Sequence, residues 1–264
     1  MTDTHRAGPD WPFWVTIAAV TGAYLLFLVG MLVSTATYSS PHHLVRAFAS
    51  REIRYATALS LVSCTVTAVL ALIVAVPVAY LMARSRFPGK NLLDTLLDVP
   101  IVLPPMVIGL ALLILFQTPI GRAIDRVVPF TYTVFGVVLA QFVVGAAFAV
   151  RQMRTTFDHL ASRPEDVAMT LGCSRGRAFL LVTLPAAERG MFSAASVAWA
   201  RSLGEFGPIL VFAGATRMKT EVLPTSVWLE LSVGNLEAAI AVSLTMIVLA
   251  VAVLLAMRAV GERP

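Results

Sequence analysis

Six stretches of apolar residues, each close to the length needed to cross a bilayer, limit what this chain can fold into. A helix needs about 20 apolar residues to cross roughly 30 Å of hydrocarbon, because its backbone groups must bond within the segment itself. Only 13% of the residues are charged, against roughly a quarter in soluble domains. We therefore predict an all-α membrane protein with about six transmembrane helices. The expected spans are Phe13–Val33, Ala56–Ala83, Val99–Phe116, Val134–Val150, Met191–Gly214 and Ala238–Met257.

The basic residues of this chain lie in short segments between the apolar stretches, although the net charge is +5. This placement indicates anchoring at the membrane interface and contact with lipid, and not a nucleic-acid surface. Cys64 lies in an apolar stretch and Cys173 in a polar one, so we expect both to be reduced. The first span is longer than the apolar core of a signal peptide, and an uncleaved anchor is favoured over a cleaved signal.

Lys and Arg are unevenly divided between the two sides of the predicted membrane. With the N-terminus in the cytoplasm, the cytoplasmic segments carry twelve of these residues and the outer segments seven. The positive-inside rule therefore places both termini in the cytoplasm, in a multi-pass protein of the cytoplasmic membrane. The cytoplasmic set is Arg6, Arg84, Arg86, Lys90, Arg151, Arg154, Arg163, Arg175, Arg177, Arg189, Arg258 and Arg263, and the outer set is Arg46, Arg51, Arg54, Arg122, Arg126, Arg217 and Lys219.

Only the fifth expected span carries charged residues, Arg201 and Glu205. Residues four apart share a helix face, so the two side chains can pair and reduce the cost of lying near the membrane. Because Glu205 would repel an anion, we expect the pair to act in gating or in helix registry. Direct contact with a substrate remains the alternative.

The longest cytoplasmic segment, residues 151–190, is too polar to enter lipid. Pro164 suits the first turn of a helix, followed by Glu165 and Asp166 where the helix dipole favours acids. We predict a helix over Glu165–Leu171, ended by Gly172, and a second short helix over about Arg175–Val182 before Leu184-Pro185. The segment is therefore either a helical hairpin for a partner or an amphipathic connector at the headgroups.

The hairpin sequence resembles the coupling motif of permease subunits of ATP-binding-cassette (ABC) importers. Their common form is Glu-Ala-Ala, three further residues, Gly, and Leu-Pro about a dozen residues on. Here Asp166 and Val167 replace the usual Glu and first Ala, whereas Ala168, Gly172 and Pro185 are in register. The resemblance implies a type I importer permease fold and docking on an ATPase subunit. The implied contact residues are Glu165, Asp166, Val167, Ala168, Leu171, Gly172 and Pro185.

Two further motifs resemble the permeases for tetrahedral oxyanions. The run from Pro100 to Leu110 with Pro119-Ile120-Gly121 is similar to the molybdate or tungstate type, and the run from Ala200 to Gly207 to a motif shared with sulfate permeases. Independently of family, two adjacent prolines break a helix, which lipid tolerates only where protein or water satisfies the freed carbonyls. Such a break indicates a pore-facing position or, alternatively, a kink for packing only. The expected translocation path or gate includes Pro104, Pro105, Arg201, Gly204, Glu205, Phe206 and Gly207.

The chain lacks the residues of an enzyme or of an ATP site. No Gly-x4-Gly-Lys-Ser/Thr loop is present, no His lies in a span, and His5, His42, His43 and His159 are scattered. We therefore expect no catalytic residue, no metal site and no cofactor on this chain, with ATP and Mg on the partner subunit. The competing class, a secondary transporter, would need ionisable residues deep in several spans.

The resemblance also implies partners and a division of the chain. The partners are an ATPase subunit, an extracytoplasmic oxyanion-binding protein and a second copy of this chain in a homodimer. Molybdate or tungstate is the expected cargo, ahead of sulfate or thiosulfate. Residues 1–50 would hold the N-terminal tail, the first span and the start of the outer loop, 51–258 the permease domain with the coupling loop at 151–190, and 259–264 a short tail.

Overall fold

Helices make up nearly all of the described chain in the computed structural model, which describes residues 11–38 and 50–261. Several residues used above for charge or histidine placement lie outside these ranges, namely His5, Arg6, His42, His43, Arg46 and Arg263. The elements are α1 (Trp11–Tyr38), α3 (Arg51–Arg84), α4 (Lys90–Val102), α5 (Pro105–Gln117), α6 (Pro119–Val127), α7 (Val134–His159), α8 (Arg163–Thr170), α9 (Arg175–Ala178), the π-helical turn η1 (Phe179–Thr183), α10 (Leu184–Ala186), α11 (Glu188–Leu203), α12 (Gly207–Phe212), α13 (Leu223–Ser232) and α14 (Leu236–Gly261).

Among the described residues, four helices are long and apolar enough to cross a membrane by themselves. They are α1, α3, α7 and α14, and they confirm the first, second, fourth and sixth expected spans. The helix α7 continues nine residues beyond the predicted end at Val150, to His159. This extension carries charged residues and leads into a helical hairpin formed by α8, α9, η1 and α10.

The third expected span is two helices and not one. The helices α4 and α5 meet at a bend of 112°. Leu103 and Pro104, which join them, both have extended backbones, with ψ of 141° and 132°. Each of these residues precedes a proline, and the residue before a proline is disfavoured in the helical conformation. The predicted break at Pro104-Pro105 is confirmed.

The fifth expected span is also interrupted. The helix α11 ends at Leu203, and α12 begins at Gly207 and has only 6 residues. Pro208 has no N–H to donate to the carbonyl of Gly204, four residues earlier, and a proline inside a helix kinks or breaks it. The prediction of one continuous helix over Met191–Gly214 is therefore wrong, and Glu205 lies in the non-helical connection.

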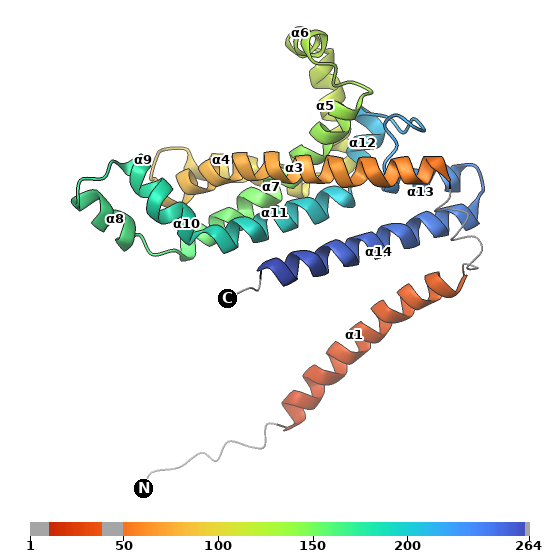
Figure 1. Cartoon of the computed structure of the whole chain (residues 1–264), viewed down its shortest axis with the longest axis horizontal. Coiled ribbons are helices and arrows are strands. Elements are labelled where there is room, and N and C mark those ends of the chain that lie inside the picture. Colours follow the sequence, from red (N-terminus) through yellow and green to blue (C-terminus); the bar gives the residue numbers. More distant parts are fainter. Residues whose placement is uncertain (1–10, 39–49, 262–264) are drawn as a thin grey trace.

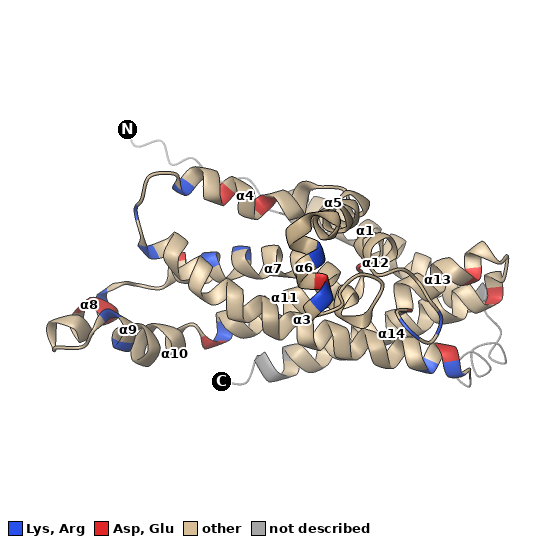
Figure 2. Ribbon diagram, turned by 90° about the horizontal axis from the view of Figure 1, so that it is seen from above, with Lys and Arg blue, Asp and Glu red and all other residues tan. Residues whose placement is uncertain are grey.

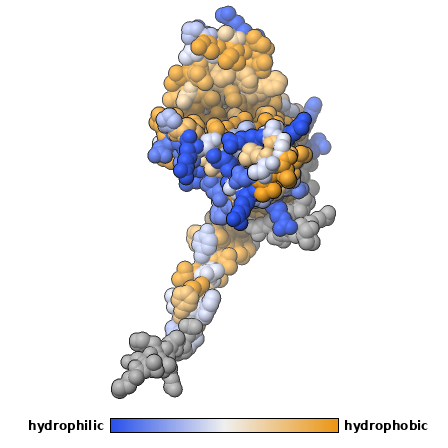
Figure 3. Space-filling model, turned by 90° about the vertical axis from the view of Figure 1, so that its left-hand side faces the viewer, coloured by the Kyte–Doolittle hydropathy of each residue, from blue (hydrophilic) through white to orange (hydrophobic). Residues whose placement is uncertain are grey.

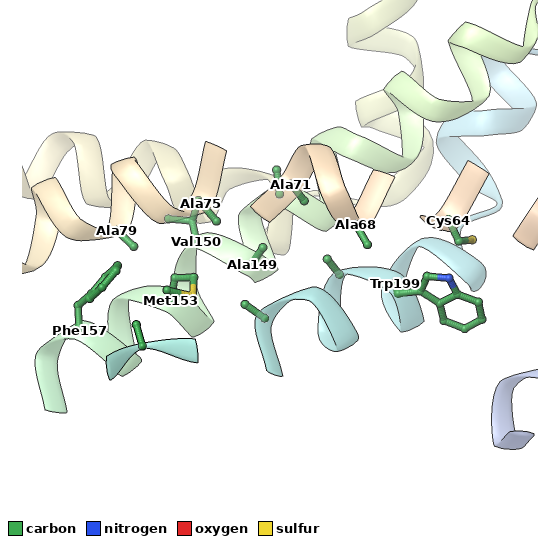
Figure 4. Packing of buried hydrophobic residues seen from close by; sticks show 14 of the residues in the cluster. Cys64, Ala68, Ala71, Ala75, Ala79, Ala149, Val150, Met153, Phe157 and Trp199 are labelled. Carbon is green, nitrogen blue, oxygen red and sulfur yellow. The ribbon is translucent and has the colours of Figure 1, made fainter. Parts of the chain in front are cut away.

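A stripe of small residues lets the central helices approach closely. On α3 it consists of Ala68, Ala71, Ala75 and Ala79, spaced three or four apart and all buried. Figure 4 shows this stripe facing side chains of α7 and α11. Small side chains at such positions are how helices pack in a membrane, where van der Waals contact replaces the hydrophobic effect between them. The three helices α3, α7 and α11 thus form the packed body of the protein.

The other helices are arranged around this body (Figure 1). The helix α14 runs alongside it, α1 stands apart with no part of its span buried, and α5 and α6 project as an arm. Charged residues gather at the hairpin end, on α4 and α6 and near the turn between α13 and α14 (Figure 2). Long uncharged stretches lie between these groups, as expected of a protein surrounded by lipid.

Two ion pairs lie between α4 and the second half of α7. A guanidinium nitrogen of Arg151 lies 3.2 Å from a carboxylate oxygen of Asp98, and Arg154 pairs with Asp94. No residue of α4 is fully buried. Leu97 of α4 also packs against the buried core of the body, so α4 is held by apolar contact as well as by these partly exposed pairs.

Candidate functional site

The first arm of the hairpin is α8, which begins with the residues that the sequence predicts. Pro164 lies in its first turn, followed by Glu165 and Asp166 near the positive end of the helix dipole. The structure starts the helix at Arg163 and ends it at Thr170, one residue before the predicted end. The α8 segment is therefore a short helix with the predicted N-terminal sequence signals.

Gly172 ends α8 in a Schellman motif. Its φ is +96°, its N–H donates to the carbonyl of Met169 at 3.0 Å, and the N–H of Cys173 donates to Ala168 at 3.1 Å. This pair of bonds requires a left-handed residue, which glycine adopts without strain. The predicted role of Gly172 as the helix terminator is confirmed. Its position beyond the helix means that it does not share a helical face with Ala168.

The second arm continues further than predicted. It runs from α9 through η1 and α10 with no interruption at Leu184-Pro185, so the expected end at Val182 is wrong. Pro185 lacks the N–H that would bond to Leu181, and the chain widens there into a π-turn, in which the N–H of Leu184 donates to Phe179. The proline is thus accommodated by a wider turn within the second arm.

An apolar surface is exposed at the tip and flank of the hairpin. Leu171 is 82% exposed and Leu181 69%, and Val167 and Leu180 are more than half exposed. Figure 3 views the molecule from this end and shows hydrophilic residues around a smaller hydrophobic area. Leu180 and Leu181 are not among the contact residues expected from the sequence. Two adjacent leucines in a polar segment are the sequence signal that could have indicated this exposed apolar surface. Of the other expected contact residues, Asp166, Gly172 and Pro185 are exposed and Ala168 is half-buried.

Glu165 stands apart from this exposed set because it is 6% exposed. Both of its carboxylate oxygens accept hydrogen bonds from within the chain. The hydroxyl of Tyr80, on α3, donates to one oxygen, and the hydroxyl of Thr183, in η1, donates to the other at 2.8 Å. Glu165 therefore connects the first arm of the hairpin to α3 and to the second arm.

The two helix breaks lie against each other where α5 meets α12. An ideal Cβ built on Gly207 would lie 2.9 Å from the backbone nitrogen of Met106 and 3.0 Å from Cβ of Pro105. One built on Gly109 would lie 2.8 Å from Cα of Pro208. The structure thus brings together the proline break of the third span and the glycine break of the fifth. Glycine is needed on both sides because backbone meets backbone.

Arg201 and Glu205 form the expected pair, at 3.6 Å between a guanidinium nitrogen and a carboxylate oxygen. Glu205 is 2% exposed, and the oxygen that faces Arg201 makes no hydrogen bond. Arg201 is partly exposed and also lies over the ring of Phe148, 5.4 Å from its centroid. Phe206 is half-buried near Trp228, with ring centroids 6.3 Å apart.

Gln141, which is not among the residues expected in the site, supports the end of α11. It is 1% exposed on α7, and its amide donates to the carbonyl of Ser202 at 3.2 Å. Its own carbonyl accepts from the hydroxyl of Thr67, on α3, at 3.3 Å. Where a helix ends in an apolar surrounding, its last carbonyls need such a partner. A single Gln in an apolar stretch was the sequence signal.

Known proteins resemble this chain over most of its length. The family described as binding-protein-dependent transport system inner membrane component matches residues 75–264. A probable molybdenum ABC transporter permease of Haloferax volcanii is 34% identical over 94% of this chain and 89% of its own. A molybdate/tungstate permease of Thermococcus kodakarensis is 40% identical over 58% of each chain. A sulfate permease of Escherichia coli is 34% identical over 62% of this chain and 61% of its own.

A solved structure supports the fold independently. A chain in the crystal structure of a bacterial alginate ABC transporter, in complex with its substrate-bound periplasmic protein, superimposes with a TM-score of 0.76. The likeness covers 96% of this chain and 95% of the other at 16% identity, so it concerns the fold alone. It agrees with the expected type I importer permease fold. The chain belongs to the binding-protein-dependent inner membrane components, among the ABC importer permeases that include the molybdate, tungstate and sulfate proteins.

Proposed function

We propose that this chain is the permease subunit of an ATP-driven importer that carries molybdate or tungstate across the cytoplasmic membrane. The observation that supports this most directly is the cytoplasmic hairpin, ended by Gly172 and exposing apolar side chains at its tip. An exposed apolar surface between polar residues is typical of a docking site. The family relationship identifies a separate ATPase subunit as the partner, which would bind ATP and Mg.

The exposed part of the hairpin defines the proposed ATPase contact. Val167, Leu171, Leu180 and Leu181 would enter an apolar cleft of the partner. Asp166, Gly172 and Pro185 are exposed beside them, and Ala168 is half-buried. Docking here puts the hairpin in the cytoplasm. Together with the distribution of Lys and Arg, this supports cytoplasmic positions for both termini.

The paired helix breaks are the proposed gate. At this point Gly207 meets Pro105 and Met106. The two breaks themselves contain Pro104 and Pro105 on one side and Gly204, Phe206 and Gly207 on the other. Interrupted helices are tolerated at membrane depth only where protein or a water-filled path satisfies their backbone groups. Rigid movement of the two breaks relative to each other would give alternating access.

A second copy of this chain and an extracytoplasmic binding protein would complete the importer. The arm formed by α5 and α6 projects from the body and exposes apolar side chains, among them Leu110, Ile114 and Ile120. A homodimer would cover part of this surface and enclose the path between the two copies. The binding protein would deliver the anion and set most of the selectivity.

The test is reconstitution in liposomes of this chain, its ATPase subunit and its binding protein. We expect molybdate uptake that requires ATP and all three proteins, and a purified complex with two copies of this chain. Competition by tungstate but not by excess sulfate would support the proposed cargo. Stronger competition by sulfate would favour the second candidate, a sulfate importer, which the sulfate relatives make a specific alternative. Uphill uptake by this chain alone would contradict the proposal.

Replacing Glu205 by Gln should change coupling more than substrate preference. The substitution removes the buried charge that faces Arg201, and so alters the connection between α11 and α12. We expect uptake per ATP hydrolysed to change severalfold, while the ratio of molybdate to sulfate uptake stays the same. Glu188→Gln, at an exposed position in the first turn of α11, is the matched control. A changed anion ratio with unchanged uptake per ATP would instead assign Glu205 to substrate contact.

A further inference from the structure

Glu165 is a buried carboxylate on α8, whose other acidic residue, Asp166, is exposed. Both Glu165 and Asp166 lie in the first turn of α8, where the helix dipole favours either one. Only Glu165 turns inward, and both of its oxygens are occupied by hydroxyl donors of this chain. A side chain enclosed in this way is poorly available to a partner protein. We therefore look for its role in contacts within this chain.

The Tyr80 hydroxyl comes from the cytoplasmic end of α3, a helix of the packed body. The ring of Tyr80 is itself held in place, with the ring of Phe157, on α7, at 5.7 Å and that of Phe179, in η1, at 4.5 Å between centroids. Nearby, Arg84 donates to the carbonyl of Leu160 at 2.7 Å, just before α8 begins. The donor to Glu165 is therefore fixed to the body and does not belong to a free side chain.

The Thr183 hydroxyl is placed by the π-turn. Thr183 is 5% exposed and is the last residue of η1. The turn is wide because Pro185, two residues later, cannot make the α-helical bond to Leu181. In a regular α-helix each residue is rotated by about 100° from the one before it. The wider turn changes this rotation, so the side chains that follow Phe179 point in other directions than they would in a regular helix. The proline of the Leu-Pro pair thus determines where Thr183 points.

We propose that Glu165 is a positioning residue that ties the hairpin to α3. Its carboxylate joins α8, α3 and η1 at one point, so that a displacement of the hairpin moves the body as a rigid unit and not by bending the hairpin alone. The inference rests on the proposed function, because it requires an ATPase that moves the hairpin. It assigns distinct roles to the two neighbouring acids, with Asp166 on the exposed side and Glu165 on the inner side.

The experiment compares two variants that each remove one hydroxyl and keep the rest of the side chain. Tyr80→Phe keeps the ring contacts, and Thr183→Val keeps the branched shape. In the reconstituted transporter we expect the ATPase subunit to copurify and to hydrolyse ATP, while uptake per ATP falls about tenfold in each variant, since hydrogen bonds to a charged group correspond to equilibrium factors of this order. In the double variant, uptake per ATP should fall by a smaller factor than the product of the two single-variant factors, because both hydroxyls act through one carboxylate.

Matched controls remove hydroxyls that do not touch Glu165. They are Tyr24→Phe, at an exposed position of α1, and Thr155→Val, at an exposed position of α7 where the hydroxyl donates to the carbonyl of Arg151. Both should keep the original uptake per ATP. A purely structural role of Glu165 would lower hydrolysis and uptake in proportion, and this result, like unchanged coupling, would overturn the inference. Wild-type protein that shows no ATP-dependent uptake would refute the proposed function, and the inference with it.

Discussion

Gly172→Trp is expected to abolish ATP-driven uptake while leaving the protein inserted in the membrane. The φ of +96° at this position is one that residues with a side chain rarely adopt, at a cost of about 1–3 kcal/mol. The cost falls on a turn outside the packed body. An indole at this position would project into open space beside Leu171, because no atom lies within 4 Å of an ideal Cβ. Both effects act on the surface proposed to meet the ATPase.

Two control variants separate backbone strain from loss of docking. Gly89→Trp carries the same kind of strain, with φ of +86° and no neighbour within 4 Å, but in the turn before α4. It should retain most of the uptake. Gly172→Asn should retain more activity than the Trp variant, because Asn tolerates the left-handed conformation and is small. The measurements are uptake, copurification of the ATPase and membrane insertion, and normal uptake by Gly172→Trp would contradict the coupling assignment.

Gly207→Ala is expected to reduce both stability and transport, although it adds a single methyl group. The new Cβ would lie 2.9 Å from the backbone nitrogen of Met106 and 3.0 Å from Cβ of Pro105. Neither neighbour can rotate away, since one is backbone and the other belongs to a proline ring. Overpacking of this kind costs about 1–3 kcal/mol. The two helix breaks should separate, which would lower the thermal midpoint of the purified protein and slow ATP-driven uptake.

The comparison for stability is Gly204→Ala, three residues earlier in the same connection. An ideal Cβ on Gly204 meets only one atom within 4 Å, the carbonyl oxygen of Arg201 at 3.9 Å. Its thermal midpoint should therefore stay close to that of the original protein. Equal midpoints for Gly204→Ala and Gly207→Ala would show that the breaks are not closely packed as described.

The first arm and the glycine turn of the hairpin were predictable because their signals are local. A proline in the first turn, two acids after it and a glycine at the end specify a short helix through neighbouring backbone groups alone. The π-turn at Phe179–Thr183 was not predictable in this way, because a proline in this position can also end a helix. The inward position of Glu165 depends on Tyr80, which lies 85 residues away in the sequence.

The two helix breaks were likewise predictable only in part. Pro104-Pro105 predicted a break in the third span, since proline removes its own hydrogen bond. The corresponding signal in the fifth span, Gly204 followed by Pro208, was visible in the sequence but was read as a continuous helix. Gln141 was overlooked for another reason, because a lone amide acquires its role only from the carbonyl of Ser202 that it meets.

The sequence by itself determined that this chain spans a membrane repeatedly, that Pro104-Pro105 breaks the third span, and that a short helix ended by Gly172 lies in the polar segment between the fourth and fifth spans. These properties follow from apolar length and from backbone chemistry within a few residues. Only the tertiary structure decided that the break at Pro104-Pro105 lies against that at Gly207, and that Glu165 faces Tyr80 and Thr183 while Leu171, Leu180 and Leu181 stay exposed. The physical reason is that these contacts join residues far apart in the sequence, so they depend on how the helices pack.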